Sequence, residues 1–241
     1  MTAATLRSPD IQADPRLIIP LDLPTRAEAE AMVERLGDAV SYYKIGLQLL
    51  AGGGMGLAQD LKRSGRQVFL DWKLHDIGAT VEKATAAIVA TRACDLLTVH
   101  AEPQVMAAAV RGRAGASGVK IVGVTVLTSL NEQDLVDLGY GVTVRDLVER
   151  RIRQALDAGL DGVVASPHEA ALARKIGGPD FLVITPGVRP AWAKADDQAR
   201  AATPAEALRA GASHLVCGRP ITAAGDPKAA AVSVIEEIAG I

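Results

Sequence analysis

The stretch Phe69-Leu-Asp-Trp-Lys-Leu-His-Asp-Ile-Gly-Ala-Thr80 joins an apolar strand to a helix and carries charged residues at the junction. Side chains two residues apart in a strand share one face, so Asp71 and Lys73 are expected to point the same way. Charges at the end of a buried run are costly unless they are paired. Taken alone, the pair is typical of a structural ion pair, and the rest of the chain must show whether a reaction centre fits better.

An alternation of apolar runs and helical segments repeats along the chain. The eight runs are residues 17–22, 41–45, 67–71, 95–100, 119–126, 161–165, 181–185 and 213–217. Ser/Thr-x-x-Glu capping boxes begin at Thr25, Ser166 and Thr203 and predict helix starts there. Continuous apolar strands that alternate with helices indicate a parallel sheet buried on both faces. The pattern predicts a single α/β domain, a (β/α)8 TIM barrel, over residues 16–241.

A doubly wound parallel sheet is the alternative architecture. Such a sheet is expected to carry a Gly-x-Gly-x-x-Gly turn after its first strand. The residues after the first run, Asp22-Leu-Pro-Thr25, do not supply that turn.

The composition excludes several classes of partner. The net charge is −2 and 3% of residues are aromatic, which gives little attraction for nucleic acid or an anionic membrane and few stacking platforms. No apolar run has the length of a membrane span, and residues 1–15 lack both a signal-peptide core and any periodicity. We therefore expect a flexible N-terminal tail over residues 1–15 and a cytoplasmic protein that binds neither nucleic acid nor membrane. Cys94 and Cys217 lie in apolar surroundings and are interpreted as core residues.

Polar residues gather at the carboxyl ends of the eight runs. In a TIM barrel these ends form one rim, where active sites lie, whereas structural ion pairs have no reason to prefer that end. This favours a functional interpretation of Asp71 and Lys73. Lys44 is expected to share the face of Tyr42 and to converge with them, and a lysine beside an ionised aspartate keeps its proton and can act as an acid. The other polar rim residues are Asp22, His100, Thr125, Thr128, Ser166, Arg189 and Arg219.

Two neighbouring runs end in a pattern typical of a phosphate site. Gly187 and Gly218 follow the seventh and eighth runs, where TIM barrels often bind phosphate through backbone N–H groups. Arg189 and Arg219 come next, and a guanidinium group can donate two hydrogen bonds to one phosphate. A tight turn with a solvated arginine explains either loop alone, but the repetition on two runs favours phosphate.

Asp76 allows two interpretations. It lies close to the expected start of a helix from Ile77 to Arg92, so it either caps that helix or reaches a site across a subunit boundary. The His, Asp and Glu residues show no convincing metal spacing, so no metal is predicted.

These residues together resemble the orotidine 5′-phosphate decarboxylase family. The segment Asp71-Trp-Lys-Leu-His-Asp-Ile77 is similar to the Asp-x-Lys-x-x-Asp signature of that family in its bacterial form. Gly78 stands where a proline is usual, and Pro190 extends the seventh loop. Further matching segments are Leu21-Asp22, Lys44-Ile-Gly46, Val124-Thr-Val-Leu-Thr-Ser129, Asp161-Gly-Val-Val-Ala-Ser-Pro-His-Glu169, Thr185-Pro-Gly-Val-Arg189, Asp197-Gln198, Ala202-Thr-Pro204 and Cys217-Gly-Arg-Pro-Ile-Thr222.

The resemblance implies decarboxylation of orotidine 5′-monophosphate to uridine 5′-monophosphate and CO2 without a cofactor, the last step of de novo UMP biosynthesis, by a homodimer. Lys73 would protonate C6 of the pyrimidine within a charged array of Lys44, Asp71, Lys73 and Asp76. Asp76, Ile77 and Thr80 would be contributed across the dimer interface. The implied substrate contacts are Asp22, Lys44 and Thr80 for the ribose, Thr128 for the pyrimidine, Gln198, Gly218, Arg219 and nearby Arg189 for the phosphate, and in addition Pro186.

Two other functions are compatible with parts of the sequence. A magnesium-dependent hexulose-phosphate synthase or a ketogulonate-phosphate decarboxylase also carries Asp-x-Lys-x-x-Asp, but it lacks the Leu127-Thr-Ser129 and Asp197-Gln198 features and would lose activity in a chelator. A catalytically silent nucleotide-binding regulator on the same fold would have no need to place a carboxylate against an anionic ligand.

Overall fold

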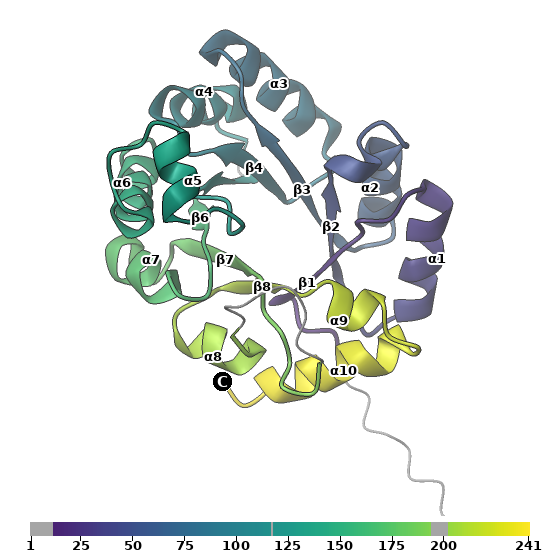
Figure 1. Cartoon of the computed structure of the whole chain (residues 1–241). Coiled ribbons are helices and arrows are strands. Elements are labelled where there is room, and N and C mark those ends of the chain that lie inside the picture. Colours follow the sequence, from purple (N-terminus) through teal and green to yellow (C-terminus); the bar gives the residue numbers. More distant parts are fainter. Residues whose placement is uncertain (1–11, 117, 194–201) are drawn as a thin grey trace, which may run out of the picture.

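Eight parallel strands close into one barrel in chain order (Figure 1). The computed structural model describes residues 12–116, 118–193 and 202–241, so most of the expected N-terminal tail and Gln198 lie outside the described residues. The pairs Leu17↔Leu215 and Ile18↔Val216 join the first strand to the last and close the ring. The predicted TIM barrel is confirmed, and the doubly wound alternative is excluded. The strands are β1 (Leu17–Pro20), β2 (Tyr42–Gly46), β3 (Gln67–Leu74), β4 (Leu96–His100), β5 (Lys120–Val124), β6 (Gly162–Val164), β7 (Leu182–Pro186) and β8 (His214–Val216).

Helices surround the barrel on its outside (Figure 1). Within the described residues, no helix is both long enough and apolar enough to cross a membrane. The main helices are α1 (Arg26–Leu36), α2 (Gly54–Arg63), α3 (Gly78–Thr91), α4 (Pro103–Arg113), α6 (Val144–Asp157), α7 (Ala170–Gly177), α8 (Pro204–Arg209) and α10 (Pro227–Ile238). Shorter helices occur in the connections and are η1 (Leu47–Leu49), α5 (Glu132–Asp137) and α9 (Arg219–Thr222).

Two of the three predicted capping boxes form. Thr25 and Thr203 each accept from the backbone N–H three residues on, and the glutamate there bonds back to the cap. The prediction at Ser166 is wrong, because α7 begins only at Ala170 and has Glu169 at its N-cap. Glu169 still accepts from the Ser166 backbone N–H at 2.8 Å, so the bond predicted by the sequence stabilises a turn that precedes the helix.

Apolar side chains fill both the inside of the barrel and the layer under the helices. The inner cluster places one residue from each of several strands against the barrel axis, as in other closed barrels. The polar residues at the carboxyl ends of the strands therefore lie directly above a layer of packed apolar side chains. The inner cluster consists of Ile18, Tyr42, Phe69, Leu96, Val122, Ile184 and Val216.

Strand β3 is irregular within the segment that carries the signature. Its pairing with β4 moves from Leu70↔Leu97 to Leu74↔Val99, so four steps along β3 match two along β4. Lys73 has a φ of 48°, in the left-handed region, which costs a residue other than glycine about 1–2 kcal/mol. The surrounding contacts must hold this conformation, and such local strain often marks a functional site.

His214 lies at the amino end of β8, opposite the polar rim. Its ring packs edge-on against Tyr42 at 5.8 Å, and its Nδ1 is buried without a hydrogen-bond partner among the described residues. Burial lowers the pKa of His214 from 6.5 to about 4, against a smaller opposing effect of Asp14. The native barrel therefore holds this imidazole neutral at a pH where the unfolded chain protonates it.

We expect the free energy of unfolding to fall by up to about 3 kcal/mol as the pH drops from 6.5 towards 4, at about 1.4 kcal/mol per pKa unit. Between pH 6.5 and about 4 the unfolded chain binds a proton at His214 that the native state largely does not, and this favours unfolding. Above pH 6.5 neither state binds that proton, so the native state has its full stability there. Denaturant unfolding of wild type and His214→Phe at a series of pH values measures it. His168→Phe, at an exposed histidine, is the control. Equal pH dependence of wild type and His214→Phe would contradict the prediction.

Candidate active site

A cavity of about 440 Å³ opens at the carboxyl ends of the strands. Its wall takes residues from β1, β2 and β3 and from β5 through β8. The structure thus brings together residues that are far apart in the sequence, at the rim where they were expected. The predicted site residues in this wall are Asp22, Lys44, Asp71, Lys73, Thr128, Pro186, Arg189, Gly218 and Arg219.

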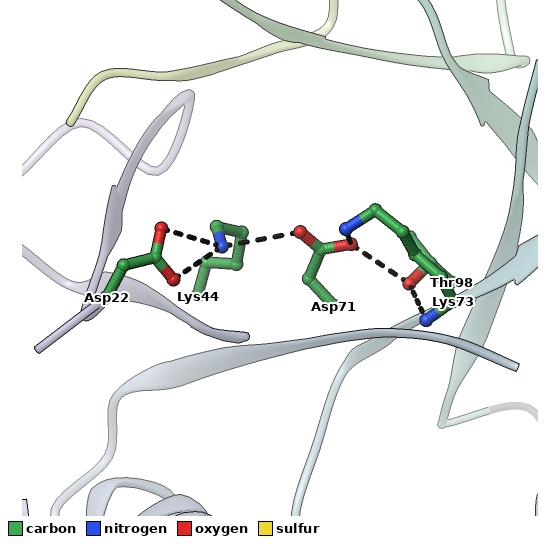
Figure 2. A network of polar contacts seen from close by, with 5 residues as sticks. All are labelled: Asp22, Lys44, Asp71, Lys73 and Thr98. Carbon is green, nitrogen blue, oxygen red and sulfur yellow. Dashed lines mark hydrogen bonds and ion pairs between the residues drawn. The ribbon is translucent and has the colours of Figure 1, made fainter. Parts of the chain in front are cut away.

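Four charged side chains form a row along this wall (Figure 2). The Nζ atom of Lys44 lies 3.0 and 3.3 Å from the two carboxylate oxygens of Asp22, and 3.3 Å from Oδ2 of Asp71. The Nζ atom of Lys73 donates to Oδ1 of Asp71 at 2.9 Å. Negative and positive charges therefore alternate along the row, and each inner charge faces opposite charges on both sides. This pairing offsets part of the cost of burying Lys44 and Asp71, whose side chains are 10% and 13% exposed.

Asp71 is held in its ionised form. Burial raises the pKa of this carboxyl group, but the neighbouring Lys44 and Lys73 lower it, as do hydrogen bonds from Lys73 and Thr98. The lowering effects dominate, so the pKa of Asp71 lies below its usual value. The wall therefore presents a fixed negative charge between two ammonium groups, an arrangement that can stabilise or destabilise charge on a bound molecule.

The expected convergence of Asp71 and Lys73 occurs with the help of Thr98. The Thr98 hydroxyl donates to Oδ1 of Asp71 at 3.1 Å and accepts from the backbone N–H of Lys73 at 2.9 Å. Thr98 thus stabilises both the carboxylate and the left-handed backbone beside it. Thr98 was not among the predicted site residues, although it stands two positions after the inward-facing Leu96 in an otherwise apolar run.

The loops after β7 and β8 carry the two predicted arginines into the wall of the same cavity. Gly187 follows β7 with a φ of 77°, a conformation that glycine adopts at little cost. Beyond it, the Arg189 backbone N–H donates to the Ala202 carbonyl at 2.9 Å and holds the loop against the start of α8. Arg219 begins α9 directly after Gly218, and both residues line the cavity. The two loops therefore present their cations and backbone to the same space.

Thr128 lies where two cavities meet. It lines the first cavity together with Val126 and Leu127, and it also lines a neighbouring cavity of about 770 Å³ that includes Ser166. The connection after β5 therefore forms the side of the site that faces away from Asp22. Two other candidates from the rim, His100 and Thr125, are in neither wall. The His100 ring lies 4.9 Å from that of His75, and the Thr125 hydroxyl donates to the Val164 carbonyl at 2.9 Å.

Asp76, Ile77 and Thr80 are exposed and do not line the cavity of their own subunit. Helix α3 begins at Gly78, and its N-cap residue Ile77 makes no side-chain cap hydrogen bond. The carboxylate of Asp76 accepts from the backbone N–H of Ile77 at 2.6 Å, one residue away. The interpretation of Asp76 as the helix cap is therefore wrong, because the helix starts one residue too late for it.

Comparison with known proteins places the whole barrel in one family. Residues 15–234 match the sequence model of the Orotidine 5'-phosphate decarboxylase / HUMPS family. The chain belongs to this family. Orotidine 5'-phosphate decarboxylase from Caulobacter vibrioides is 70% identical over 233 residues, which are 95% of this chain and 99% of the relative. The protein of the same name from Rhodopseudomonas palustris is 56% identical over 232 residues, 95% of this chain and 98% of the relative.

A solved structure agrees with this assignment. The crystal structure of orotidine 5'-phosphate decarboxylase from Lactobacillus acidophilus superposes with a TM-score of 0.81 at 33% sequence identity. The match covers 93% of this chain and 99% of the other. Within the described residues, no group of three or more His, Cys, Asp or Glu side chains is arranged to hold a metal ion.

Proposed function

We propose that this chain catalyses the decarboxylation of orotidine 5′-monophosphate to uridine 5′-monophosphate and CO2, the last step of de novo UMP biosynthesis. The observation that carries the proposal is the alternating row Asp22–Lys44–Asp71–Lys73 in the wall of a cavity that also contains Arg189 and Arg219. Membership of the decarboxylase family supports the same reaction. Synthesis of a nucleotide also fits the cytoplasmic location expected from the sequence.

Lys73 is the proton donor in this proposal. When the bond from C6 to the carboxylate carbon breaks, its electron pair stays on C6 and the carboxylate leaves as CO2. The Lys73 ammonium group stabilises the negative charge that develops on C6 and then transfers a proton to it. Lys73 recovers a proton from solvent. The 2.9 Å contact with Asp71 and the bond from its backbone to Thr98 support this role, because both fix the position of the ammonium group.

Asp71 acts on the bound substrate before CO2 leaves. Its carboxylate lies beside Lys73, so a substrate with C6 against Lys73 places its own carboxylate near Asp71. The two negative charges repel each other in the substrate complex, and the repulsion disappears with CO2. Lys44 and Thr98 keep Asp71 ionised and oriented for this purpose.

The remaining wall residues bind the rest of the nucleotide. Asp22 and Lys44 bind the ribose hydroxyl groups, and Thr128 binds the pyrimidine. The phosphate contributes binding energy far from C6, which can be used to position the reacting carbon. Pro186, Arg189, Gln198, Gly218 and Arg219 complete the substrate contacts around the phosphate end.

The active unit in this proposal is a homodimer in which Asp76, Ile77 and Thr80 of each subunit complete the site of the other. The three residues are exposed, and Asp76 has no capping role in its own helix. Ile77 is 68% exposed, and Leu47 and Leu50, after the neighbouring strand β2, are 57% and 48% exposed. Exposed apolar side chains at the rim support a contact with a second copy there.

Loss of the orotidylate absorbance, followed with and without EDTA, tests the proposed function. We expect turnover that EDTA does not reduce, because all the proposed contacts are side-chain and backbone groups of the protein. A magnesium-dependent hexulose-phosphate synthase would leave orotidylate unchanged and would lose its own activity in EDTA. A silent nucleotide-binding regulator would bind uridine 5′-monophosphate without turnover. Either result would exclude the decarboxylase assignment.

A further inference from the structure

Arg151 lies in α6 and does not line the cavity, but its guanidinium group binds residues that follow β4 and β5 at the rim. Its side chain is 11% exposed. One terminal nitrogen donates to the backbone carbonyl of Thr125, and the other donates to Oε1 of Glu102 at 2.9 Å and to the Tyr140 hydroxyl at 3.0 Å. The guanidinium carbon also lies 5.6 Å from the centre of the Tyr140 ring. The guanidinium group carries its donors on separate nitrogens, so it reaches acceptors on two sides that are too far apart for a single ammonium nitrogen.

These contacts fix both ends of the connection between β5 and α6. Thr125 follows the last residue of β5, and Tyr140 lies shortly before α6. Between them, Val126, Leu127 and Thr128 line the cavity. Arg151 therefore contacts both ends of the segment that carries Thr128 without lining the cavity itself.

Glu102 extends the same network to the end of β3. It is the N-cap residue of α4, yet its side chain makes no cap hydrogen bond and turns to Arg151 instead. Its second oxygen, Oε2, is buried and has no hydrogen-bond partner among the described residues, and it lies 3.5 Å from the Nε2 atom of His75. His75 stands between Lys73 and Asp76 in the signature segment. A path of polar groups thus runs from the β5 connection through Arg151 and Glu102 to His75, two residues after Lys73.

We propose that Arg151 and Glu102 are positioning residues that hold the β5 connection, with Thr128, at a fixed distance from the end of β3, with Lys73. The inference rests on the proposed function, in which the pyrimidine ring lies between these two elements. A shift of about 1 Å between a proton donor and its acceptor lowers a rate by roughly 100-fold. The network therefore acts on the alignment of C6 with Lys73 and not on the binding of the phosphate.

Two other arginines provide matched controls. Arg113 forms a similarly buried ion pair with Asp161, their side chains being 19% and 16% exposed, but Asp161 precedes β6 at the amino end of the barrel. Arg153 lies on the same helix as Arg151 and forms a surface pair with Glu149. Arg113→Ala thus controls for the loss of a buried ion pair, at a place far from the site. Arg153→Ala controls for the effect of replacing an arginine of α6 by alanine on the stability of that helix.

The experiment compares kcat for orotidine 5′-monophosphate with the binding of two ligands, uridine 5′-monophosphate and ribose 5-phosphate, which lacks the pyrimidine. For Arg151→Ala we expect kcat to fall by about 100-fold and uridine 5′-monophosphate to bind more weakly, with ribose 5-phosphate binding unchanged. Arg113→Ala is expected to lower Tm but to keep the wild-type kcat and both affinities. Arg153→Ala is expected to match the wild type throughout.

Wild-type kcat in folded Arg151→Ala, or an equal loss in Arg113→Ala, would overturn the inference. A parallel loss of ribose 5-phosphate binding would overturn it too, since general disruption of the site explains that result. If Arg151→Ala does not fold, Tyr140→Phe and Glu102→Gln test the inference instead. Each keeps the shape of the side chain, and the first removes only the hydroxyl group and the second only the charge. Both variants must lower kcat and keep the wild-type affinity for ribose 5-phosphate. Failure of the wild type to decarboxylate orotidine 5′-monophosphate would instead reject the proposed function.

Discussion

Lys73→Ala is expected to lose turnover by a factor of about 10⁴ or more while the protein still binds uridine 5′-monophosphate. General acid catalysis contributes roughly 10²–10⁴-fold, and one electrostatic contact to a developing charge contributes about 10²–10³-fold. Lys73 supplies both in the proposed mechanism, because its ammonium group faces the cavity and is held by Asp71. Steady-state kinetics gives kcat, and calorimetry gives the affinity for the product.

Lys228→Ala is the matched control for this variant. Lys228 forms an exposed ion pair with Asp38, and its side chain is 50% exposed. Its removal deletes the same ammonium group outside the cavity, so kcat and product affinity are expected to stay at the wild-type values. Circular dichroism establishes that both variants are folded. Near-normal turnover of Lys73→Ala would rule out Lys73 as the proton donor.

The convergence of Asp71 and Lys73 was predictable, but the backbone that produces it was not. Period-two alternation correctly placed both side chains on the face of Phe69, inside the barrel. The irregular pairing with β4 and the left-handed φ of Lys73 depend on the register of a second strand and on the hydroxyl of Thr98. A local pattern in one strand contains no information about that register.

The polar path through Arg151 could not be predicted for a related reason. Arg151 and Glu102 are 49 residues apart and lie on different helical segments, so no spacing in the sequence joins them. Arg151 falls within a helix that has four arginines, one glutamate and two aspartates, where a solvent-exposed face is the ordinary interpretation. Only the closed barrel brings the end of β4 beside α6.

Local signals gave the start of a helix incorrectly at two places. At Ser166 the side-chain bond predicted for a capping box forms, but the helix begins at Ala170. At Asp76 the exact start of the helix decided between two roles, because Asp76 either caps the helix or contacts a partner subunit. The position of α3 excludes the first and leaves the second as a proposal.

Asp76→Ala and Lys73→Ala are each expected to be inactive alone and to restore activity when their subunits are mixed. In the proposed homodimer one site combines Lys73 of one subunit with Asp76 of the partner subunit. A mixed dimer then has one site with both residues intact and one site with neither. Random exchange makes half of the dimers mixed, so about a quarter of all sites should be active. Removal of Asp76 alone should lower kcat by about 10²–10³-fold, so the restored activity stands well above the background.

The mixture of Lys73→Ala with Asp71→Ala is the control, because both residues belong to the same wall of one subunit. Every site in its mixed dimers lacks one of the two, so no activity should return. Exchange is promoted by mild denaturation followed by refolding, and it is verified with a tag on one variant. Mixed dimers of Asp76→Ala and Lys73→Ala that stay inactive would show that Asp76 serves the cavity of its own subunit. Wild-type kcat in Asp76→Ala alone would remove Asp76 from the site altogether. The expected return of a quarter of the activity is specific to a site shared between two subunits, because neither variant carries both residues and neither can supply them within one chain.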